Sequence, residues 1–462
     1  MILISSFRKF LLVFLLFSLD SALADNANVQ EYHLKNGLTL LVKEDHRSPV
    51  VFSSVWYKVG GSYESDGATG VSHALEHMMF RGSKNYPAGA VEKLINENGG
   101  DQNAMTTNDQ TIYYQRLSAD KLPLSFQIES DRMQNLLLKK SDFEKEIQVV
   151  MEERRMRFDD NPMALTYERF MAAALVNNPY HHQTIGWMTD LENMTVDNVR
   201  QWYHAWYTPN NAIIVVVGDV NPAQVHALAN QYFGNIPSSP VPSTKPRTEI
   251  PALGTKRVDV NVPAKVPVIF MGYQVPSMVT TRESELCYAL DVLTALLGGS
   301  ASSRFSEDLV RGKQIASYAQ ASYDPLQLYS SLLTLVGVPA QGHNVQELEQ
   351  AFREEITALQ TKPITQTVLE RIKAQVVAAE VYQRDSLANQ AMELGGLVSI
   401  HLPWQLSKTY VTQIDAVTPE QVQTVAKKFL TDDRLTVAVL HPQGEPKQSD
   451  NAMPMTTGGG LH

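Results

Sequence analysis

The feature that most constrains the fold is a repeat shared by the two halves of the chain. Residues 195–217 (TVDNVRQWYHAWYTPNNAIIVVV) match residues 418–440 (TPEQVQTVAKKFLTDDRLTVAVL) at a constant offset. Each segment begins with a helix-capping Thr, continues through a helix and a short turn, and ends in an apolar strand. A repeat of this length predicts two copies of one unit in tandem. Because the identity is low, a chance likeness between two helix–turn–strand units stays an alternative.

A stretch rich in Pro and Ser separates the two halves. Residues 237–251 (PSSPVPSTKPRTEIP) carry five prolines and no apolar periodicity, which is typical of an interdomain linker. The predicted division is an N-terminal domain over 25–236, a linker over 237–254, a C-terminal domain over 255–441 and a polar, disordered tail over 442–462.

The first 24 residues have the pattern of a cleaved signal peptide. Arg8 and Lys9 precede the short apolar run 10–17, and Ala22-Leu23-Ala24 fits a cleavage site. The apolar run is too short to cross a bilayer, and no later segment is long and apolar enough to do so. We therefore expect an exported protein without a membrane span, periplasmic in a Gram-negative host and otherwise secreted.

The composition is that of a globular protein with no nucleic-acid partner. Of the 462 residues, 44% are hydrophobic, which is enough for a sizeable core. The net charge of −10 and the absence of a basic block argue against nucleic-acid binding. The only cysteine, Cys287, lies in an apolar helical pattern, so we expect a buried thiol and no disulfide within the chain.

The first half mixes strands and helices in an order that does not alternate strictly. This order favours an α+β fold, with two homologous layered domains, over a doubly wound sheet. Ser141 and Glu144 suggest a capping box that opens a long helix. The expected elements are strands over 32–43 and 50–59, a helix that carries residues 73–77, a helix over 91–98 that ends at Gly99-Gly100, a strand pair over 103–117 and a helix over 141–158.

Two histidines and a glutamate form a compact pattern, HALEH, at residues 73–77. His73 and His77 lie one helical turn apart on the same face, and Glu76 points to that face as well. A catalytic zinc ion needs a third protein ligand and an open water position. Zinc lowers the pKa of bound water to roughly 7, and a nearby carboxylate can then take its proton. HxxEH is one of the zincin signatures, so the pattern predicts a zinc peptidase.

The helix over 141–158 offers the third ligand. Its four candidates are Glu144, Glu146, Glu152 and Glu153. Glu146 and Glu153 are nearly aligned on one face, whereas Glu152 is displaced by about a quarter turn. We predict that Glu153 binds the metal and that Glu146 supports the site from one layer behind.

The motif alone is also compatible with an exposed polar helix face. The flanking residues argue against that alternative, because Val71, Leu75, Met78, Met79 and Phe80 are apolar and surround the polar side chains. Polar groups that are half-buried in this way need partners. Together with the second helix, the motif therefore predicts one zinc ion per chain.

The chain resembles the pitrilysin family of inverzincins, and its size is similar to that of the two-domain bacterial and mitochondrial-processing-peptidase-like branch. The resemblance extends over about residues 29–440. It implies His73, His77 and Glu153 as zinc ligands, Glu76 as general base and Glu146 as the supporting helix glutamate. Its best-matching blocks are GVSHALEHMMFRGS, GGDQNAMTTNDQTIYY, FEKEIQVVMEERRM and YTPNNAIIVVVGDV.

The resemblance also implies residues that bind the substrate. Asn103, Ala104, Met105 and Thr106 resemble the edge strand on which the family lays its peptide substrate as an added β-strand. Arg311 and Tyr318, in RGKQIASY, resemble the pair that completes the active site from the far side and stabilises the tetrahedral intermediate. Taken alone, both sets are compatible with ordinary structural roles.

The second half has no HxxEH and is expected to be a copy of the fold without metal. In the family, two such units surround a chamber, and the Arg/Tyr pair of one unit serves the zinc site of the other. This chain carries both sets, which favours a homodimer over a heterodimer with a related subunit. The predicted function is a zinc endopeptidase that acts on peptides or short unfolded segments. The alternatives are a non-catalytic scaffold of the same fold and a maturation protease for one dedicated substrate.

Overall fold

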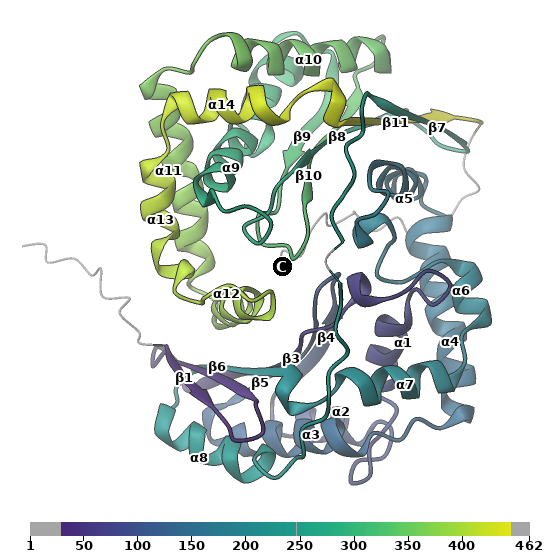
Figure 1. Ribbon diagram of the computed structural model, residues 1–462, viewed down its shortest axis with the longest axis vertical. Coiled ribbons are helices and arrows are strands. Elements are labelled where there is room, and N and C mark those ends of the chain that lie inside the picture. Colours follow the sequence, from purple (N-terminus) through teal and green to yellow (C-terminus); the bar gives the residue numbers. More distant parts are fainter. Residues whose placement is uncertain (1–28, 246, 445–462) are drawn as a thin grey trace, which may run out of the picture.

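The structure is a computed structural model that describes residues 29–245 and 247–444. The predicted signal peptide over 1–24 and the part of the predicted tail after Gly444 lie outside these ranges. Two β-sheets face each other across the middle of the molecule, one in each half of the chain (Figure 1). In the described part of the chain, no helix combines the length and the apolar character needed to cross a membrane.

The first sheet has six strands in the order β1-β2-β6-β3-β5-β4. Only β2 and β6 pair in parallel, and the other pairs are antiparallel. The strand β4 therefore lies at an edge. The bounds are β1 Gln30–His33, β2 Thr39–Glu44, β3 Val50–Tyr57, β4 Asp101–Thr106, β5 Thr111–Ser118 and β6 Ala212–Gly218.

The second sheet has five strands in the order β7-β11-β8-β10-β9 and repeats the pairing of the first. Its parallel pair is β7 and β11, and β9 occupies the edge that β4 occupies in the first sheet. The bounds are β7 Lys256–Val262, β8 Val268–Val275, β9 Ala316–Ser322, β10 Ser331–Pro339 and β11 Leu435–Pro442.

The repeat detected in the sequence occupies equivalent places in the two sheets. Helix α7 (Val196–Trp206) leads into β6, and α14 (Pro419–Phe429) leads into β11. Thr195 and Thr418 cap these helices, each in a capping box with the residue three positions later. Each of the two strands then joins the inside of its sheet, parallel to the first long strand of its half. The predicted fold of two homologous α+β units is confirmed.

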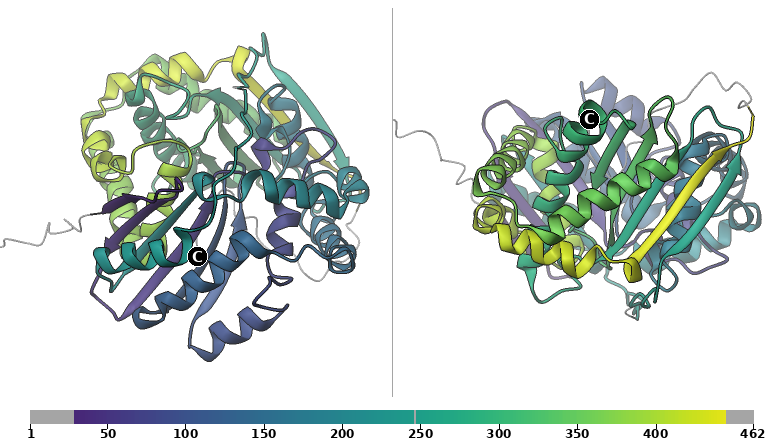
Figure 2. Two further views of the ribbon diagram at one scale, coloured as in Figure 1. Left: turned by 60° about the horizontal axis from the view of Figure 1, so that its bottom comes forward. Right: turned by 90° about the horizontal axis from the view of Figure 1, so that it is seen from above.

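Helices of each half cover the outer face of its own sheet. In Figure 2, α10 and α14 cross in front of the second sheet when the molecule is seen from above. The remaining bounds in the first half are α1 Val71–Met78, α2 Ala90–Glu97, α3 Leu122–Asn135, α4 Lys140–Arg154, α5 Pro162–Ala174, α6 Met188–Asn193 and α8 Pro222–Phe233. Those in the second half are α9 Ser284–Gly298, α10 Val345–Thr361, α11 Gln366–Gln383, α12 Leu387–Ser399 and α13 Leu406–Ala416.

The inner faces of the two sheets are covered by helices that the halves exchange. Helix α12 of the second half packs on Phe52 and Trp56 of β3, and α5 of the first half packs on Phe270 of β8. Gly395 of α12 lies so close to Trp56 that a Cβ atom there would come within 2.2 Å of the indole ring. The two units are therefore joined by interlocked hydrophobic layers as well as by the linker.

Three local predictions differ from the structure. The single strand expected over 32–43 is a hairpin of β1 and β2, because Gly37 adopts a φ of +88° in the turn between them. Ser141 does not cap α4: the helix begins at Lys140, and Lys139 at the N-cap forms no side-chain cap hydrogen bond. The second sheet extends to Pro442, one residue into the predicted tail. Cys287 is buried and unpaired, as expected.

Candidate metal centre

Helix α1 holds the two histidines against the core. Val71, Ala74, Leu75 and Met78 are buried, so the opposite face of α1, with its polar residues, is oriented toward α4. Gly70 at the N-cap has a φ of +87°, and a Cβ atom there would come within 2.4 Å of the Ile185 carbonyl oxygen. The start of the helix is therefore fixed by a position that only glycine fills without strain.

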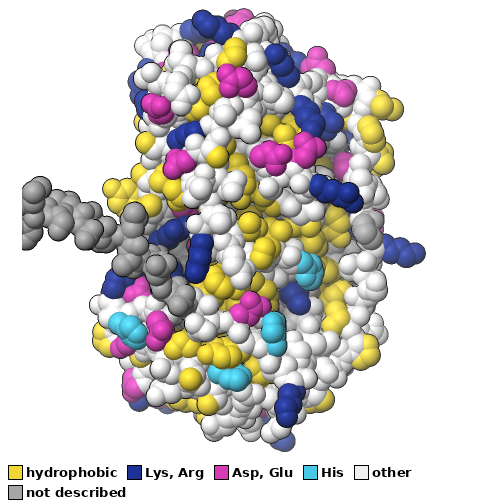
Figure 3. Space-filling model, turned by 60° about the vertical axis from the view of Figure 1, so that its left-hand side comes forward, with side chains coloured by type: hydrophobic (Ala, Val, Ile, Leu, Met, Phe, Trp, Pro, Cys, Tyr) yellow, Lys and Arg dark blue, Asp and Glu magenta, His cyan; other side chains and the backbone are white. Residues whose placement is uncertain are grey.

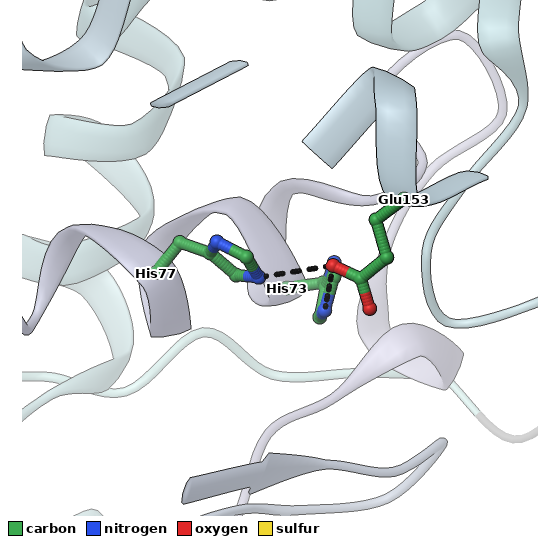
Figure 4. A group of neighbouring side chains, drawn as sticks. All are labelled: His73, His77 and Glu153. Carbon is green, nitrogen blue, oxygen red and sulfur yellow. Dashed lines mark ion pairs between the residues drawn. The ribbon is translucent and has the colours of Figure 1, made fainter. Parts of the chain in front are cut away.

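Helix α4 brings a glutamate to the same place. In Figure 4, the two imidazole rings project from α1 and the Glu153 carboxylate reaches them from α4. Oε2 of Glu153 lies 3.3 Å from Nε2 of His77 and 3.8 Å from Nε2 of His73. One ligand atom from each of the three residues lies within 4.8 Å of the others. Among the described residues, this is the group of His, Cys, Asp or Glu side chains that could hold a metal ion.

The donor set fits a zinc ion. Two imidazoles and one carboxylate are the ligands of many catalytic zinc sites, which keep a fourth position open. Burial lowers the pKa of His73 to about 4, so its ring is neutral and its nitrogen lone pair is available for a metal. Burial would also lower the pKa of His77, but its hydrogen bonds with Glu146 and Glu153 raise that pKa to about 9. This raised pKa reflects the two carboxylates that face the ring.

Glu146 lies behind His77. Its Oε1 accepts a hydrogen bond from Nδ1 of His77 at 2.9 Å, and its other oxygen pairs with Arg81. A carboxylate on the outer nitrogen of a ligating histidine fixes the tautomer and the orientation of the ring. The remaining glutamates of α4 point away: Glu144 pairs with Lys140 and Glu152 with Arg155, all at the surface.

Glu76 lies between the group formed by His73, His77 and Glu153, here called the metal group, and the edge strand β4. The hydroxyl of Thr106, at the end of β4, donates a hydrogen bond to Oε2 of Glu76 at 2.5 Å. Burial raises the pKa of Glu76, and the hydrogen bond from Thr106 opposes that rise. The carboxylate is thereby held in one orientation next to His77, one of the candidate metal ligands.

Comparisons with known proteins relate the chain to peptidase family M16 and to proteins that are named zinc proteases. Residues 39–186 match the family model for Insulinase (Peptidase family M16), and residues 193–376 match that for the Peptidase M16 inactive domain. The zinc protease PqqE of Helicobacter pylori is 32% identical in an alignment 422 residues long, which covers 88% of this chain and 92% of that protein. The chain belongs to peptidase family M16. The resemblance identified from the sequence is confirmed, and the second half is the inactive domain of the family.

Solved structures of M16 proteins share the fold. A protease from Helicobacter pylori superposes with a TM-score of 0.85 at 30% identity, over 90% of this chain and 100% of that one. The periplasmic protease PqqL of Escherichia coli has a TM-score of 0.74 at 20% identity. The matched region is 92% of this chain but 48% of PqqL, so PqqL is about twice as long.

The M16 fold places the predicted substrate strand at the free edge of the first sheet. Asn103 to Thr106 lie on β4, which pairs with β5 on one side only. The N–H of Ala104 donates to the side-chain oxygen of its neighbour Asn103 at 2.9 Å. This is an acceptor that a peptide carbonyl can replace.

Arg311 and Tyr318 lie in the second half, far along the chain from the metal helix. Arg311 is near the end of a π-helical segment (η6, Phe305–Gly312) and forms an ion pair with Glu307 at 3.7 Å. Tyr318 is on β9, is 45% exposed and hydrogen-bonds Gln320. Their contacts are thus with neighbours in their own half, and the structure of one chain does not bring them to His73, His77 and Glu153.

Two supports of the M16 site were missed by sequence reasoning. Glu64 is buried, and its two oxygens accept the N–H groups of Gly70 and Ser72 at 2.7 and 2.8 Å, so it caps α1 from outside the helix. Arg154, the residue after Glu153, forms a bidentate pair with Glu168 of α5 at 2.8 and 3.1 Å, and both are buried. Both contacts join different elements, and no spacing rule indicates them.

Proposed function

We propose that this chain is a zinc-dependent endopeptidase that hydrolyses extended peptides or short unfolded segments, with one zinc ion per chain. The observation that carries this proposal is the convergence of His73, His77 and Glu153 on one point next to Glu76. The names of the relatives support the activity, and the geometry supports its assignment to these residues.

The roles of the residues follow from their positions. His73, His77 and Glu153 would hold a zinc ion, which would supply Lewis acidity and lower the pKa of water toward neutral. Glu76 accepts the proton of the attacking water and passes it to the leaving amine. The hydroxyl of Thr106 donates a hydrogen bond to one carboxylate oxygen of Glu76, so the other oxygen is left to accept a hydrogen bond from the water.

The free edge of strand β4 supports a site that accepts peptides of many sequences. A peptide that adds to the free edge of β4 is held by main-chain hydrogen bonds, which do not depend on its side chains. Only an extended segment can pair in this way, so folded domains are excluded unless they offer an unfolded stretch. This favours peptides and unfolded segments over a single dedicated substrate.

The variant Glu76→Gln tests the catalytic role. It keeps the size of the side chain and the three zinc ligands, so we expect zinc binding to be retained and turnover of a quenched peptide to fall at least about 100-fold. Turnover of the wild-type protein should be lost with a chelator and restored by zinc. A wild-type protein that binds zinc but cleaves no peptide of a broad library would support the scaffold alternative.

We further propose that two copies of the chain form the active enzyme, with Arg311 and Tyr318 of one copy serving the zinc site of the other. The contacts of both residues within their own half and the two-unit length of PqqL support this arrangement. A heterodimer with a related subunit is the alternative.

Mixing two inactive variants tests whether Arg311 and Tyr318 act at the zinc site of their own chain or at that of the other copy. Glu76→Gln lacks the base, whereas a double variant with Arg311→Ala and Tyr318→Phe lacks the far-side pair. After co-refolding, half of the dimers are mixed and each has one intact site, so about a quarter of wild-type activity should return. No recovery in dimers of proven mixed composition would contradict the proposed sharing.

Export is proposed from the pattern of residues 1–24, with a periplasmic location in a Gram-negative host. One relative of the same fold, PqqL, is described as periplasmic. Fractionation of cells that express the full chain, with and without residues 1–24, tests this location.

A further inference from the structure

We propose that a cavity between the two halves of the chain binds an organic cation, an ammonium or guanidinium group carried on an apolar stem. The cavity has a volume of about 730 Å³, and residues of both halves line it. The metal ligands His73, His77 and Glu153 are not among them. It lies beside α11, α12 and α13, on a side of the molecule where hydrophobic side chains gather at mid-height (Figure 3).

Four acidic residues line the cavity, and two of them pair with an arginine outside it. Asp291 of α9, Asp324 in the loop after β9, Glu380 of α11 and Glu393 of α12 all contribute to its wall. Within the described part of the chain, no Lys, Arg or His is a lining residue. Arg384 pairs from outside the cavity with Glu380 at 3.1 Å and with Glu393 at 3.9 Å.

Asp291 and Asp324 form no ion pair with any residue that the structure describes. Asp291 accepts a hydrogen bond from the hydroxyl of Tyr410 at 2.5 Å, and Asp324 accepts the N–H of Leu326 at 2.8 Å. Burial raises the pKa of Asp291 to about 6, and repulsion from Asp324 and Glu380 adds to this rise. Burial also raises the pKa of Asp324. A bound cation would stabilise both carboxylates in their charged form.

Two hydroxyl groups indicate a ligand independently of the carboxylates. Tyr288 and Thr334 are only 5% and 8% exposed, and both line the cavity. No hydrogen bond links either hydroxyl to another described residue, and neither oxygen is among the fully buried unpaired polar atoms, so both keep access to the cavity. Both hydroxyls can accept a hydrogen bond from an ammonium or guanidinium group.

The aromatic side chains explain why the cation is organic. Tyr167 and Tyr180 from the first half and Tyr288, Tyr323 and Tyr410 from the second line the cavity. Such rings attract a cation through their π faces and also cover an apolar stem. A bare metal ion is disfavoured, because in the described residues the acidic groups of the cavity do not converge as the metal group around Glu153 does. The cavity therefore suits an elongated cation that reaches two separate carboxylates.

The cation has two chemical sources, a free amine or a Lys or Arg side chain of a peptide. Isothermal titration calorimetry of the full chain with agmatine and with cadaverine tests the first source. A blocked peptide that contains Lys, compared with the same peptide carrying norleucine, tests the second, with Glu76→Gln as the protein so that no cleavage occurs. Saturable binding of either cation supports the proposal and identifies the source. Because binding is measured without turnover, the result does not depend on the proposed peptidase activity.

The variants Asp291→Asn and Asp324→Asn keep the shape of the side chains and remove the charge. Each should raise the Kd for the cation by about tenfold or more. The matched control is Asp433→Asn, an exposed carboxylate in the short helix before β11, which should leave the Kd unchanged. Tyr288→Phe removes only an unpaired hydroxyl, so it should fold normally and weaken binding. Absence of saturable binding for every cation, or a Kd that neither Asp variant changes, would overturn the proposal.

Discussion

The hydrogen bond between Glu146 and His77 makes a quantitative prediction about zinc affinity. In Glu146→Gln the side chain can still accept from Nδ1 of His77, but it loses its negative charge and its pair with Arg81. Burial alone would raise the pKa of Glu146, yet the hydrogen bonds from His77 and Arg81 lower it, so the carboxylate is charged and supports the ring strongly. Loss of such a partner costs about 10–100-fold in metal affinity. Because Gln keeps one acceptor, we expect about tenfold, or about 1.4 kcal/mol.

Competition between the protein and a zinc-chelating dye measures this loss directly. Glu144→Gln is the matched control, because it makes the same change on the same helix. Glu144 is exposed and pairs with Lys140 at 3.7 Å, away from the metal group. Its zinc affinity should equal that of the wild type. Equal zinc affinities for Glu146→Gln and Glu144→Gln would refute the reasoning that the outer carboxylate orients His77.

Two further predictions concern stability. Arg154→Met leaves Glu168 buried without a partner and should lower the free energy of unfolding by about 3–5 kcal/mol in urea titrations. Arg155→Met breaks only a surface pair with Glu152 and should lower it by less than about 1 kcal/mol. Similar losses for the two variants would contradict this account. Burial raises the pKa of Asp291 to about 6 in the folded protein, so its contribution to stability is complete below pH 4 and is lost as the pH rises through 6. Unfolding curves between pH 4 and 7 should therefore show a smaller pH dependence for Asp291→Asn than for the wild type, and parallel pH profiles would count against it.

The parts of the site that the sequence predicted depend on spacing within one element. His73 and His77 share a face because they are four residues apart on a helix, and Glu146 and Glu153 are aligned because they are seven apart. The structure places these four side chains at one site. The repeat around Thr195 and Thr418 was also readable, because caps and apolar runs are local patterns.

The parts that the sequence could not predict depend on contacts between distant segments. The cap that Glu64 provides for α1 and the pair between Arg154 and Glu168 join elements whose spatial relation follows only from the complete fold. The prediction of a single strand over 32–43 was wrong because the apolar pattern continues through the turn at Gly37. Ser141 matched a capping pattern, yet α4 begins one residue earlier, and helix ends are the least certain part of a sequence pattern.

The exchange of α5 and α12 predicts that the metal-binding half cannot fold alone. A fragment over 29–254 lacks α12, so the inner face of its sheet would lose its cover over Phe52, Trp56, Ile112, Ile213 and Val215, which are at most 2% exposed. At about 1.5–3 kcal/mol for each of the five buried side chains, the loss is about 7.5–15 kcal/mol, as large as the whole stability of a typical domain. We expect the fragment to bind a hydrophobic dye and to bind zinc weakly, and addition of residues 386–404 through a fused linker to reverse both changes. A fragment that unfolds cooperatively, binds no dye and keeps full zinc affinity without α12 would show that the exchanged helix is dispensable, and the two halves would then be independent domains that happen to touch.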